Sequence, residues 1–565
     1  MFAMPHLNKR LMLRTGFISL SIILLILLAP SLTLHEDGDV LADPSSSPSI
    51  DSARPNGWNW DSNQEKWFNS VGGHKTNTNT KNGWSTKTKA KLKDLINLNV
   101  NVNGKKWKDA QETLYGRNGY ENGYEGQGKD GWVDLERELL VTKYEGGTPG
   151  YQVFSNLYLV NSVLTSVVPS TNQLIIPDQG MENEMQMDMD MQEHLSEESS
   201  PYKKFPDVKY IMSSEKRGVV AGEDRWKVVD QDVGREEIGK KGFRLGGVTY
   251  IFNDPPGPDG YLVYFRHFVL EAFLGATRVL ASTLSGSSVT PTPKRVWFPR
   301  CGSEPSWRDD RGENAWFLAQ ALPAATIEDK HGWEDKNTAG LPILLEKVVI
   351  IDRWAAHSSG GEVGKWGKMN ALIPSLPAAQ TFWEPIRSNV MRSLGVDGHT
   401  GIGSRGLPVI VYVDRQKENP KMRQADHNAL VEGLMSLTNI AEVHVARIAA
   451  MSKARQVELM GRAQVIISIH GDELFTSLWM PQRENSLVIE LFEEGGFVRD
   501  FELLASGLNH KYVAISGDSL LPEEKWRESG STKGPERDKG EISINTELII
   551  RTIEETLNIH SIAED

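Results

Sequence analysis

Short apolar runs alternate with amphipathic segments along the last third of the chain. Four of these runs are apolar enough to form strands buried on both faces of a sheet, and segments with helical spacing separate them. The expected strands are Pro408–Val413, Glu442–Arg447, Val465–Ile469 and Ser486–Phe492, and the expected helices are Ala425–Leu437 and Ser452–Ala463, with Ser452 as N-cap. This alternation predicts a parallel, doubly wound α/β sheet, which binds ligands at the carboxyl ends of its strands.

The central part of the chain has strand-like and helix-like segments in a less regular order. Val153–Val168 and Lys347–Asp352 are typical of strands, and the segment from Tyr264 to Ser282 has the pattern of a helix. Residues 178–200 contain eight acids, five methionines and no Lys or Arg, which predicts a disordered insertion. Because 565 residues are too many for one ordinary core, we expect two or more domains.

The first 140 residues predict a membrane anchor followed by a spacer. Three basic residues precede residues 15–34, an uncharged run long enough to cross a bilayer, and acidic residues follow it. The positive-inside rule then places residues 1–14 in the cytosol and the rest in the lumen, as in a single-pass type II protein of the Golgi or endoplasmic reticulum membrane. A cleaved signal peptide is the alternative. Residues 35–140 are rich in Asn, Gly, Ser, Thr and Lys, which is typical of a stem.

Charge and cysteine content exclude several classes of protein. A net charge of −13 argues against a nucleic-acid partner, because phosphate binding requires a basic surface. Cys301 is the only cysteine, so no intrachain disulfide can form and no cysteine-based zinc site is expected. A lone cysteine is more often inert than catalytic.

Three short motifs match known patterns without the context that those patterns need. Asp188-Met-Asp190 and Asp230-Gln-Asp232 fit an Asp-x-Asp metal motif, but the first lies in low-complexity sequence and nothing around the second supports it. Gly401–Gly406 fits G-x-G-x-x-G, but it precedes a strand, whereas a dinucleotide-binding motif follows one. We therefore expect no metal site and no dinucleotide site from these motifs.

The segment from Ile469 to Pro481 has the strongest chemical signal. A strand ends at His470, Gly471 makes a turn, and a short helix that ends at Pro481 begins at once. A helix N-terminus presents free N–H groups and a positive dipole end, which together favour a diphosphate. His470 could donate a hydrogen bond to the same phosphates. An ordinary strand–helix turn with a satisfied histidine is the alternative.

Four further polar positions are candidates for chemistry. Arg415 follows the strand Pro408–Val413 and could bind a diphosphate with two hydrogen bonds; a surface arginine paired with Asp414 or Glu418 is the alternative, and Arg423 is a second candidate. His267 and Glu271 are four residues apart on one face of the predicted helix. Either could take a proton from a hydroxyl group or orient it, and a purely structural pair is the alternative.

Five stretches in order resemble glycosyltransferase family 61 in its fungal form. They span roughly residues 150–520 and comprise Phe154–Asn161, Tyr264–Glu271 with Gly275 and Arg278, Val348–His357, Val411–Gln416 with Arg423 and His427, and His470–Pro481 with Val488–Glu490. Animal relatives, which act on EGF domains and dystroglycan, transfer N-acetylglucosamine to protein hydroxyls. Plant relatives transfer xylose or arabinose to glycans.

The resemblance implies a fold, a reaction and a set of site residues. The expected fold is α/β, with two Rossmann-like domains that face a cleft (GT-B type): an acceptor-side domain at residues 141–400 and a nucleotide-sugar domain at residues 401–565. The expected reaction is inverting, metal-independent transfer of xylose or N-acetylglucosamine from a UDP-sugar to a hydroxyl of a glycan or glycoprotein, with no other cofactor. The donor-binding candidates are Arg415, Arg423, His470, Gly471, Thr476 and Glu490, and the catalytic candidates are His267 and Glu271.

The chain departs from the family pattern just after His470-Gly471. Asp472 and Glu473 stand where the family has small or neutral residues, and carboxylates there would repel a diphosphate. Phe475 and Thr476 replace the family's Thr and His. A non-catalytic lumenal binding protein on a degenerate glycosyltransferase fold is therefore the alternative function. A secreted hydrolase is a further rival, which no G-x-S-x-G or H-E-x-x-H motif supports.

Overall fold

The computed structural model describes residues 130–170, 205–214, 219–257, 260–284, 289–303, 306–358, 372–396, 403, 406–528 and 540–558. These residues belong to one compact unit, Trp67–Asp565. The expected anchor at residues 15–34, the insertion at residues 178–200 and most of the expected stem lie outside them. Within the described ranges no helix is both long enough and apolar enough to cross a membrane.

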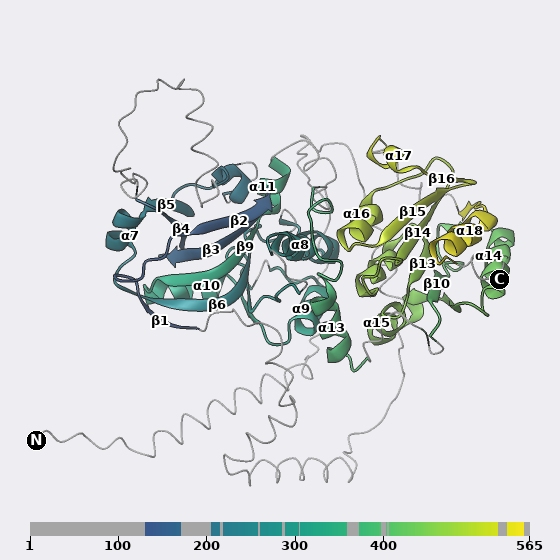
Figure 1. The fold of residues 1–565 in the computed structure, drawn as a ribbon, viewed down its shortest axis with the longest axis horizontal. Coiled ribbons are helices and arrows are strands. Elements are labelled where there is room, and N and C mark those ends of the chain that lie inside the picture. Colours follow the sequence, from purple (N-terminus) through teal and green to yellow (C-terminus); the bar gives the residue numbers. More distant parts are fainter. Residues whose placement is uncertain are drawn as a thin grey trace, which may run out of the picture. The chain divides into compact units, whose positions relative to one another are not determined.

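The first sheet is mixed (Figure 1). Its nine described strands are β1 Gly131–Asp134, β2 Lys143–Thr148, β3 Tyr151–Val160, β4 Val163–Val168, β5 Trp226–Asp230, β6 Lys241–Phe252, β7 Arg295–Trp297, β8 Thr326–Glu328 and β9 Ile343–Ile351. The order is β5-β4-β3-β9-β6-β7-β8, with β1 beside β6 and β2 beside β3. Strands β9, β6, β7 and β8 pair in parallel, whereas β3 runs antiparallel to β2, β4 and β9. Strands β4 and β5 also pair in parallel, and the β9-β6-β7-β8 part forms the longest run with the pairing expected of a Rossmann-like domain.

Two local features of this sheet add to the expected elements: the strands expected at Val153–Val168 are present, and a strand lies earlier in the chain than expected. The apolar stretch Val153–Val168 is a hairpin, because Asn161 and Ser162 adopt φ of 49° and 64° between β3 and β4, as a two-residue turn requires. Strand β1 lies inside the range expected for the stem, and Leu135 just after it is fully buried.

Helices cover both faces of the first sheet. They are α6 Val208–Ile211, α7 Gln231–Glu237, η4 Arg266–Phe273, α8 Leu274–Ser282, α9 Glu313–Ala321, α10 Lys330–Ala339, α11 Arg353–Ser358 and α13 Glu384–Ser393. Tyr250 and Phe252 of β6 pack with η4 and α8, while Ile251 belongs to the cluster on the opposite face. The helix expected from Tyr264 to Ser282 is a π-helix, η4, that continues as the α-helix α8. Single π-helical turns are rare and are frequently found at functional sites.

The second sheet confirms the predicted alternation of strands and helices. Its strands are β10 Val409–Val413, β12 Glu442–Ala446, β13 Val465–Ile469, β14 Leu487–Phe492, β15 Lys511–Ser516 and β16 Ser519–Leu520, in the order β12-β10-β13-β14-β15-β16. All pairs are parallel except β15 with β16. Strands β11 Lys421–Met422 and β17 Glu541–Ile542 form a separate parallel pair. Counted along the chain, the order of the parallel strands is 2-1-3-4-5, so the strand order reverses between β10 and β13.

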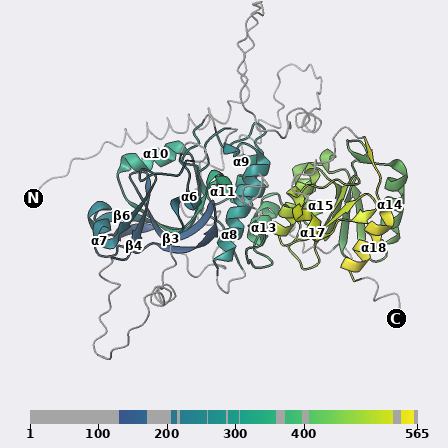
Figure 2. The same cartoon turned by 90° about the horizontal axis from the view of Figure 1, so that it is seen from above.

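The helices of this part of the chain are α14 Gln424–Ser436, η5 Ile448–Ala450, α15 Lys453–Met460, η6 Asp472–Trp479, α16 Asp500–Gly507, α17 Glu523–Glu528 and α18 Thr546–Thr556. Ile410 and Tyr412 of β10 pack in one cluster with α14 and α18, which lie side by side (Figure 2). Val409 and Val411 belong to the cluster on the other face, with α15 and α16. The Ser452 hydroxyl accepts from the Arg455 N–H at 3.3 Å, which confirms the predicted N-cap.

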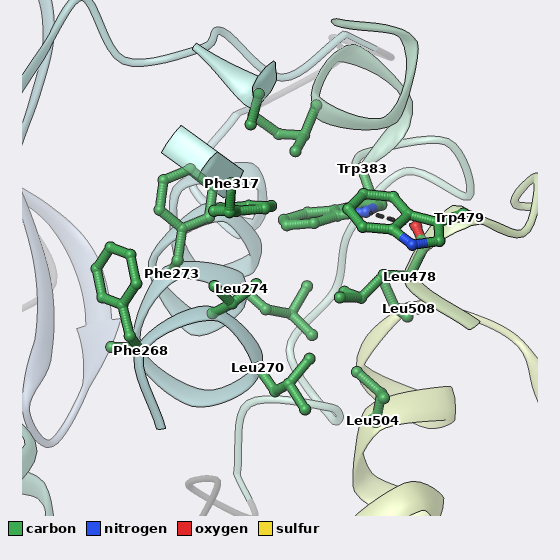
Figure 3. Packing of buried hydrophobic residues seen from close by; sticks show 14 of the residues in the cluster. Phe268, Leu270, Phe273, Leu274, Phe317, Trp383, Leu478, Trp479, Leu504 and Leu508 are labelled. Carbon is green, nitrogen blue, oxygen red and sulfur yellow. Dashed lines mark hydrogen bonds between the residues drawn. The ribbon is translucent and has the colours of Figure 1, made fainter. Parts of the chain in front are cut away.

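A continuous apolar cluster joins helices of the first sheet to those of the second (Figure 3). Phe273 of η4 contacts Trp383, with ring centroids 6.1 Å apart, and the Trp383 indole donates to the Leu478 carbonyl at 3.1 Å. Arg278 of α8 lies at the edge of the same cluster and is 4% exposed. Its guanidinium donates to the carbonyls of Ile373, Pro374, Leu376 and Gly507 and to the Asn509 side chain. Burial lowers the pKa of Arg278 to about 10. Its hydrogen bonds to backbone carbonyls make its part in the family-like segment structural.

Candidate active site

Arg415 and His470 meet at the point where the order of the second sheet reverses. Arg415 follows β10 and His470 follows β13, and these strands are parallel neighbours. The buried Arg415 guanidinium donates from Nη1 to the His470 carbonyl at 2.8 Å. Gly471 allows this approach, because a Cβ at that position would overlap the guanidinium. Parallel sheets bind ligands at this kind of position.

The His470 imidazole is fixed by a buried carboxylate. Nδ1 lies 2.5 Å from Oε1 of Glu490, a β14 residue with no exposed surface, and Oε2 of Glu490 accepts from the Tyr512 hydroxyl at 2.5 Å. Burial raises the pKa of Glu490, and the bonds from His470 and Tyr512 oppose that shift. The ring also stacks on Phe492, with centroids 5.5 Å apart. Nε2 is therefore the ring nitrogen oriented for a ligand.

The helix predicted after Gly471 is present as a 3₁₀-helix, η6, which ends just before Met480-Pro481. Its first turn carries Asp472 and Glu473. The Thr476 hydroxyl is buried and donates to the Glu473 carbonyl at 2.5 Å, so Thr476 acts within the helix itself.

The two acids that depart from the family pattern are both paired with arginines. Asp472 forms an ion pair with Arg266 at the start of η4. Oε2 of Glu473 lies 3.3 Å from Nη1 of Arg415, and Oε2 of Glu418 lies 3.5 Å from Nε of the same guanidinium. The structural alternative predicted a surface arginine paired with Asp414 or Glu418. Arg415 does pair with Glu418, but it is buried and also faces Glu473.

Arg423 is not brought to this site. It is the N-cap residue of α14, its side chain is 55% exposed, and its guanidinium pairs with Asp426 at 3.1 Å. Within the described ranges, no contact joins it to Arg415 or His470. Of the predicted donor-side residues, Arg415, His470, Gly471 and Glu490 come together, Thr476 lies beside them in η6, and Arg423 lies apart.

The predicted acceptor-side pair is also in direct contact. Nδ1 of His267 lies 3.0 Å from Oε2 of Glu271, on the π-helix η4. Arg353 donates from Nε to the same oxygen at 2.5 Å, and Nε2 of His357 lies 3.4 Å from Oε1. Burial alone would raise the pKa of Glu271, but the Arg353 charge and the two histidine hydrogen bonds outweigh it and hold that pKa at about 2. Glu271 is thus a stable anion at neutral pH.

Sequence reasoning missed Arg353, His357 and Asp254 as members of this cluster. Asp254 comes shortly after β6 and Arg353 shortly after β9, and these strands are parallel neighbours. Oδ1 of the fully buried Asp254 accepts from the Arg353 N–H at 2.9 Å. Burial and the nearby charge of Asp352 raise the pKa of Asp254 well above its ordinary value. The sequence does show a polar residue after each of these two buried strands, which could have indicated the cluster. It does not show that β6 pairs with β9, and that pairing brings the two residues together.

Contacts between η4 and η6 place the two clusters next to each other. Besides the Arg266–Asp472 ion pair, the Arg266 guanidinium lies over the Phe475 ring, 4.9 Å from its centroid. The Phe265 and Phe475 rings are 6.5 Å apart between centroids. His267 directly follows Arg266, and Gly471 directly precedes Asp472, so each cluster of candidates borders one partner of this ion pair.

Two residues considered for other chemistry are structural. Cys301 has no exposed surface, and burial raises the pKa of its thiol to about 12, which leaves it protonated and inert. Asp230 is the N-cap of α7, where its carboxylate accepts from the N–H groups of Asp232 and Val233. Asp188-Met-Asp190 and most of Gly401–Gly406 lie outside the described residues.

The family model described as Glycosyltransferase 61 matches residues 265–488. This stretch runs from the residue before η4 into β14 and contains His267, Glu271, Arg415 and His470. The protein is therefore a glycosyltransferase. Over this segment the chain is similar to glycosyltransferase family 61. A search of curated proteins found no match to the chain.

Proposed function

We propose that the protein transfers a sugar from a uridine-diphosphate donor to a hydroxyl group of a glycan or glycoprotein. The observation that carries this proposal is the convergence of Arg415 and His470 where the order of the parallel sheet reverses. An arginine fork matches the geometry of phosphate oxygens, and cationic donors stabilise a diphosphate as it leaves. His470, oriented by Glu490, would donate from Nε2 to the same diphosphate.

On the acceptor side we propose His267 as the general base and Glu271 as the residue that orients it. A carboxylate with a pKa of about 2 is a poor proton acceptor at neutral pH, whereas an imidazole held by a carboxylate is a good one. The acceptor oxygen would lose its proton to His267 and attack the anomeric carbon. The bond from that carbon to the diphosphate oxygen would break, and the charge left on the diphosphate would face Arg415.

The finer features of this proposal come from the family resemblance. They are xylose or N-acetylglucosamine as the sugar, inversion at the anomeric carbon, a GT-B arrangement of the two sheet-bearing parts, and independence of metal ions. The sequence of residues 1–34 supports a type II anchor and a lumenal site in the Golgi or endoplasmic reticulum. Once a donor sugar is found, a chelator should leave its turnover unchanged.

The test is calorimetric titration of the purified full-length protein with uridine diphosphate. We expect binding, and at least a tenfold weaker affinity for Arg415→Lys and His470→Ala, because each loses a hydrogen bond to a charged group worth about 1.5–3 kcal/mol. The lysine of Arg415→Lys keeps a cation beside Glu418 and Glu473, so we expect the fold to be preserved. It cannot form the paired hydrogen bonds that a guanidinium makes to phosphate oxygens. Arg423→Lys is the matched control and should bind like the unaltered protein.

A folded, unaltered protein that does not bind uridine diphosphate would contradict the proposal. That result would favour a donor site blocked by Glu473, in which the Arg415 guanidinium pairs with Glu418 and Glu473 and does not bind a diphosphate. Equal loss in Arg423→Lys and Arg415→Lys would also contradict it, because only Arg415 lies beside His470.

A further inference from the structure

The Arg415 guanidinium lies among buried polar atoms that lack hydrogen bonds. In the part of the chain that the structure describes, Nε of Arg415, Oε2 of Glu418 and Oε2 of Glu473 are all buried and have no hydrogen-bond partner. The Glu473 side chain is 2% exposed. Buried polar atoms in folded proteins are nearly always satisfied, and three together around one cation are a departure from that rule. A bound ligand or an added proton would supply hydrogen-bond partners for these atoms.

The charges around Arg415 leave an excess of negative charge. When both carboxylates are ionised, Glu418 and Glu473 contribute two negative charges against one positive charge on Arg415. Arg447 contributes a further attraction to Glu418. The neighbouring acids are already paired, Asp472 with Arg266 and Glu490 with His470. A diphosphate that binds Arg415 would therefore approach two carboxylates that share this arginine as an ion-pair partner, and they would repel it.

Glu418 is the carboxyl group best placed to accept a proton. Burial and the neighbouring Glu473 carboxylate raise the pKa of Glu418 to about 7, although Arg415 and Arg447 oppose that shift. A protonated Glu418 can donate a hydrogen bond to Glu473, which satisfies both oxygens that now lack partners. The pair would then share one proton, as closely spaced carboxyl groups do.

We propose that binding of a diphosphate at Arg415 is coupled to the uptake of one proton by the Glu418–Glu473 pair. This inference rests on the proposed function and adds control of that site by pH. The proton comes from solvent and binds Glu418, which then donates to Glu473. The carboxylates lose half of their negative charge, and Arg415 turns its remaining donors to the phosphate oxygens. Affinity for the diphosphate falls as pH rises, because the proton becomes harder to supply.

The test is calorimetric titration of the full-length protein with uridine diphosphate at pH 8, in two buffers with different ionisation enthalpies. Phosphate buffer is avoided because phosphate would compete with uridine diphosphate for Arg415. The second ionisation of a phosphate group occurs near pH 6, so the ligand is fully ionised and brings no proton. The difference in observed heat between the buffers measures proton uptake, which we expect to approach one. Affinity should fall by close to tenfold for each pH unit above about 7.

Glu418→Gln identifies the group that takes up the proton. Glutamine keeps a donor toward Glu473 and cannot titrate, so we expect no proton uptake, an affinity that is independent of pH between 7 and 9, and about tenfold tighter binding at pH 8. Glu432→Gln, an exposed position on α14, makes the same change in charge and should behave like the unaltered protein. Glu473→Gln removes the other member of the pair and should also abolish the uptake.

The outcomes separate this inference from the proposed function. Binding of uridine diphosphate without proton uptake by the unaltered protein would overturn the inference and leave the proposed function standing. Uptake that persists in Glu418→Gln and Glu473→Gln would place the proton on another group, such as His470, and would also overturn it. Absence of binding by the unaltered protein would overturn both.

Discussion

Arg266 and Asp472 form an ion pair that joins the start of η4 to the start of η6. The side chains are 14% and 32% exposed, so the pair is partly shielded from water. His267 follows the arginine and Gly471 precedes the aspartate, which makes this pair the direct link between the acceptor-side and donor-side candidates. Asp472 is also one of the two acids that depart from the family pattern, and its charge is balanced within the protein.

The first prediction is that Arg266 and Asp472 are energetically coupled. In a double-mutant cycle with Arg266→Gln and Asp472→Asn, we expect an interaction free energy of about 1 kcal/mol from denaturant unfolding, since charged neighbours in one network couple by about 0.5–3 kcal/mol. The exposed pair of Arg455 and Glu458 on α15, with side chains 53% and 44% exposed, is the comparison and should couple more weakly. Additive effects of Arg266→Gln and Asp472→Asn on the free energy of unfolding would show that the ion pair does not couple η4 to η6.

The second prediction concerns the close approach of Gly471 to Arg415. Gly471→Ala should weaken uridine-diphosphate binding by about tenfold or more, because the new methyl group displaces the guanidinium from its position on the His470 carbonyl. The φ of Gly471 is 170°, an extended conformation open to alanine, so the fold should tolerate the change. Gly131→Ala on β1, where nothing lies near the added Cβ, is the control and should bind normally. Unchanged binding by Gly471→Ala would mean that Arg415 does not contact the diphosphate.

The third prediction is an acid-dependent loss of stability due to Glu271. Its pKa is about 2 in the folded protein against an ordinary value of 4.5, so its contribution is present above pH 4.5 and is lost as pH falls from 4.5 toward 2. The contribution amounts to about 3 kcal/mol. Denaturant unfolding at several pH values should show a steeper decline over this range for the unaltered protein than for Glu271→Gln. Parallel pH profiles would contradict the assignment of Glu271 as the paired anion.

The fourth prediction separates the structural arginine from the binding arginine. Arg278→Met should lower the free energy of unfolding by about 3 kcal/mol or more, because several buried carbonyl oxygens lose their donor. The affinity of the folded fraction for uridine diphosphate should not change. Arg551→Met on α18, whose side chain is 63% exposed and pairs with Glu555, is the matched control and should cost less than about 1 kcal/mol. A loss of affinity in Arg278→Met without a loss of stability would contradict the structural assignment.

The local pattern of the sequence determined the elements of the second sheet. The expected strands coincide closely with β10, β12, β13 and β14, and Ser452 caps α15 as predicted. These features depend on periodicity and capping over a few residues, which the chain displays directly. The same reasoning predicted the contact between His267 and Glu271, because residues four apart on a helix are neighbours regardless of the rest of the fold.

Contacts between distant residues were decided by the tertiary structure alone. Glu473 lies beside Arg415, and Arg353 beside Asp254, because β10 pairs with β13 and β6 with β9. Strand order is set by packing across the whole sheet, and no local pattern encodes it. For the same reason the sequence presented Asp472 and Glu473 as charges that repel a diphosphate, whereas in the fold each faces an arginine supplied by another element.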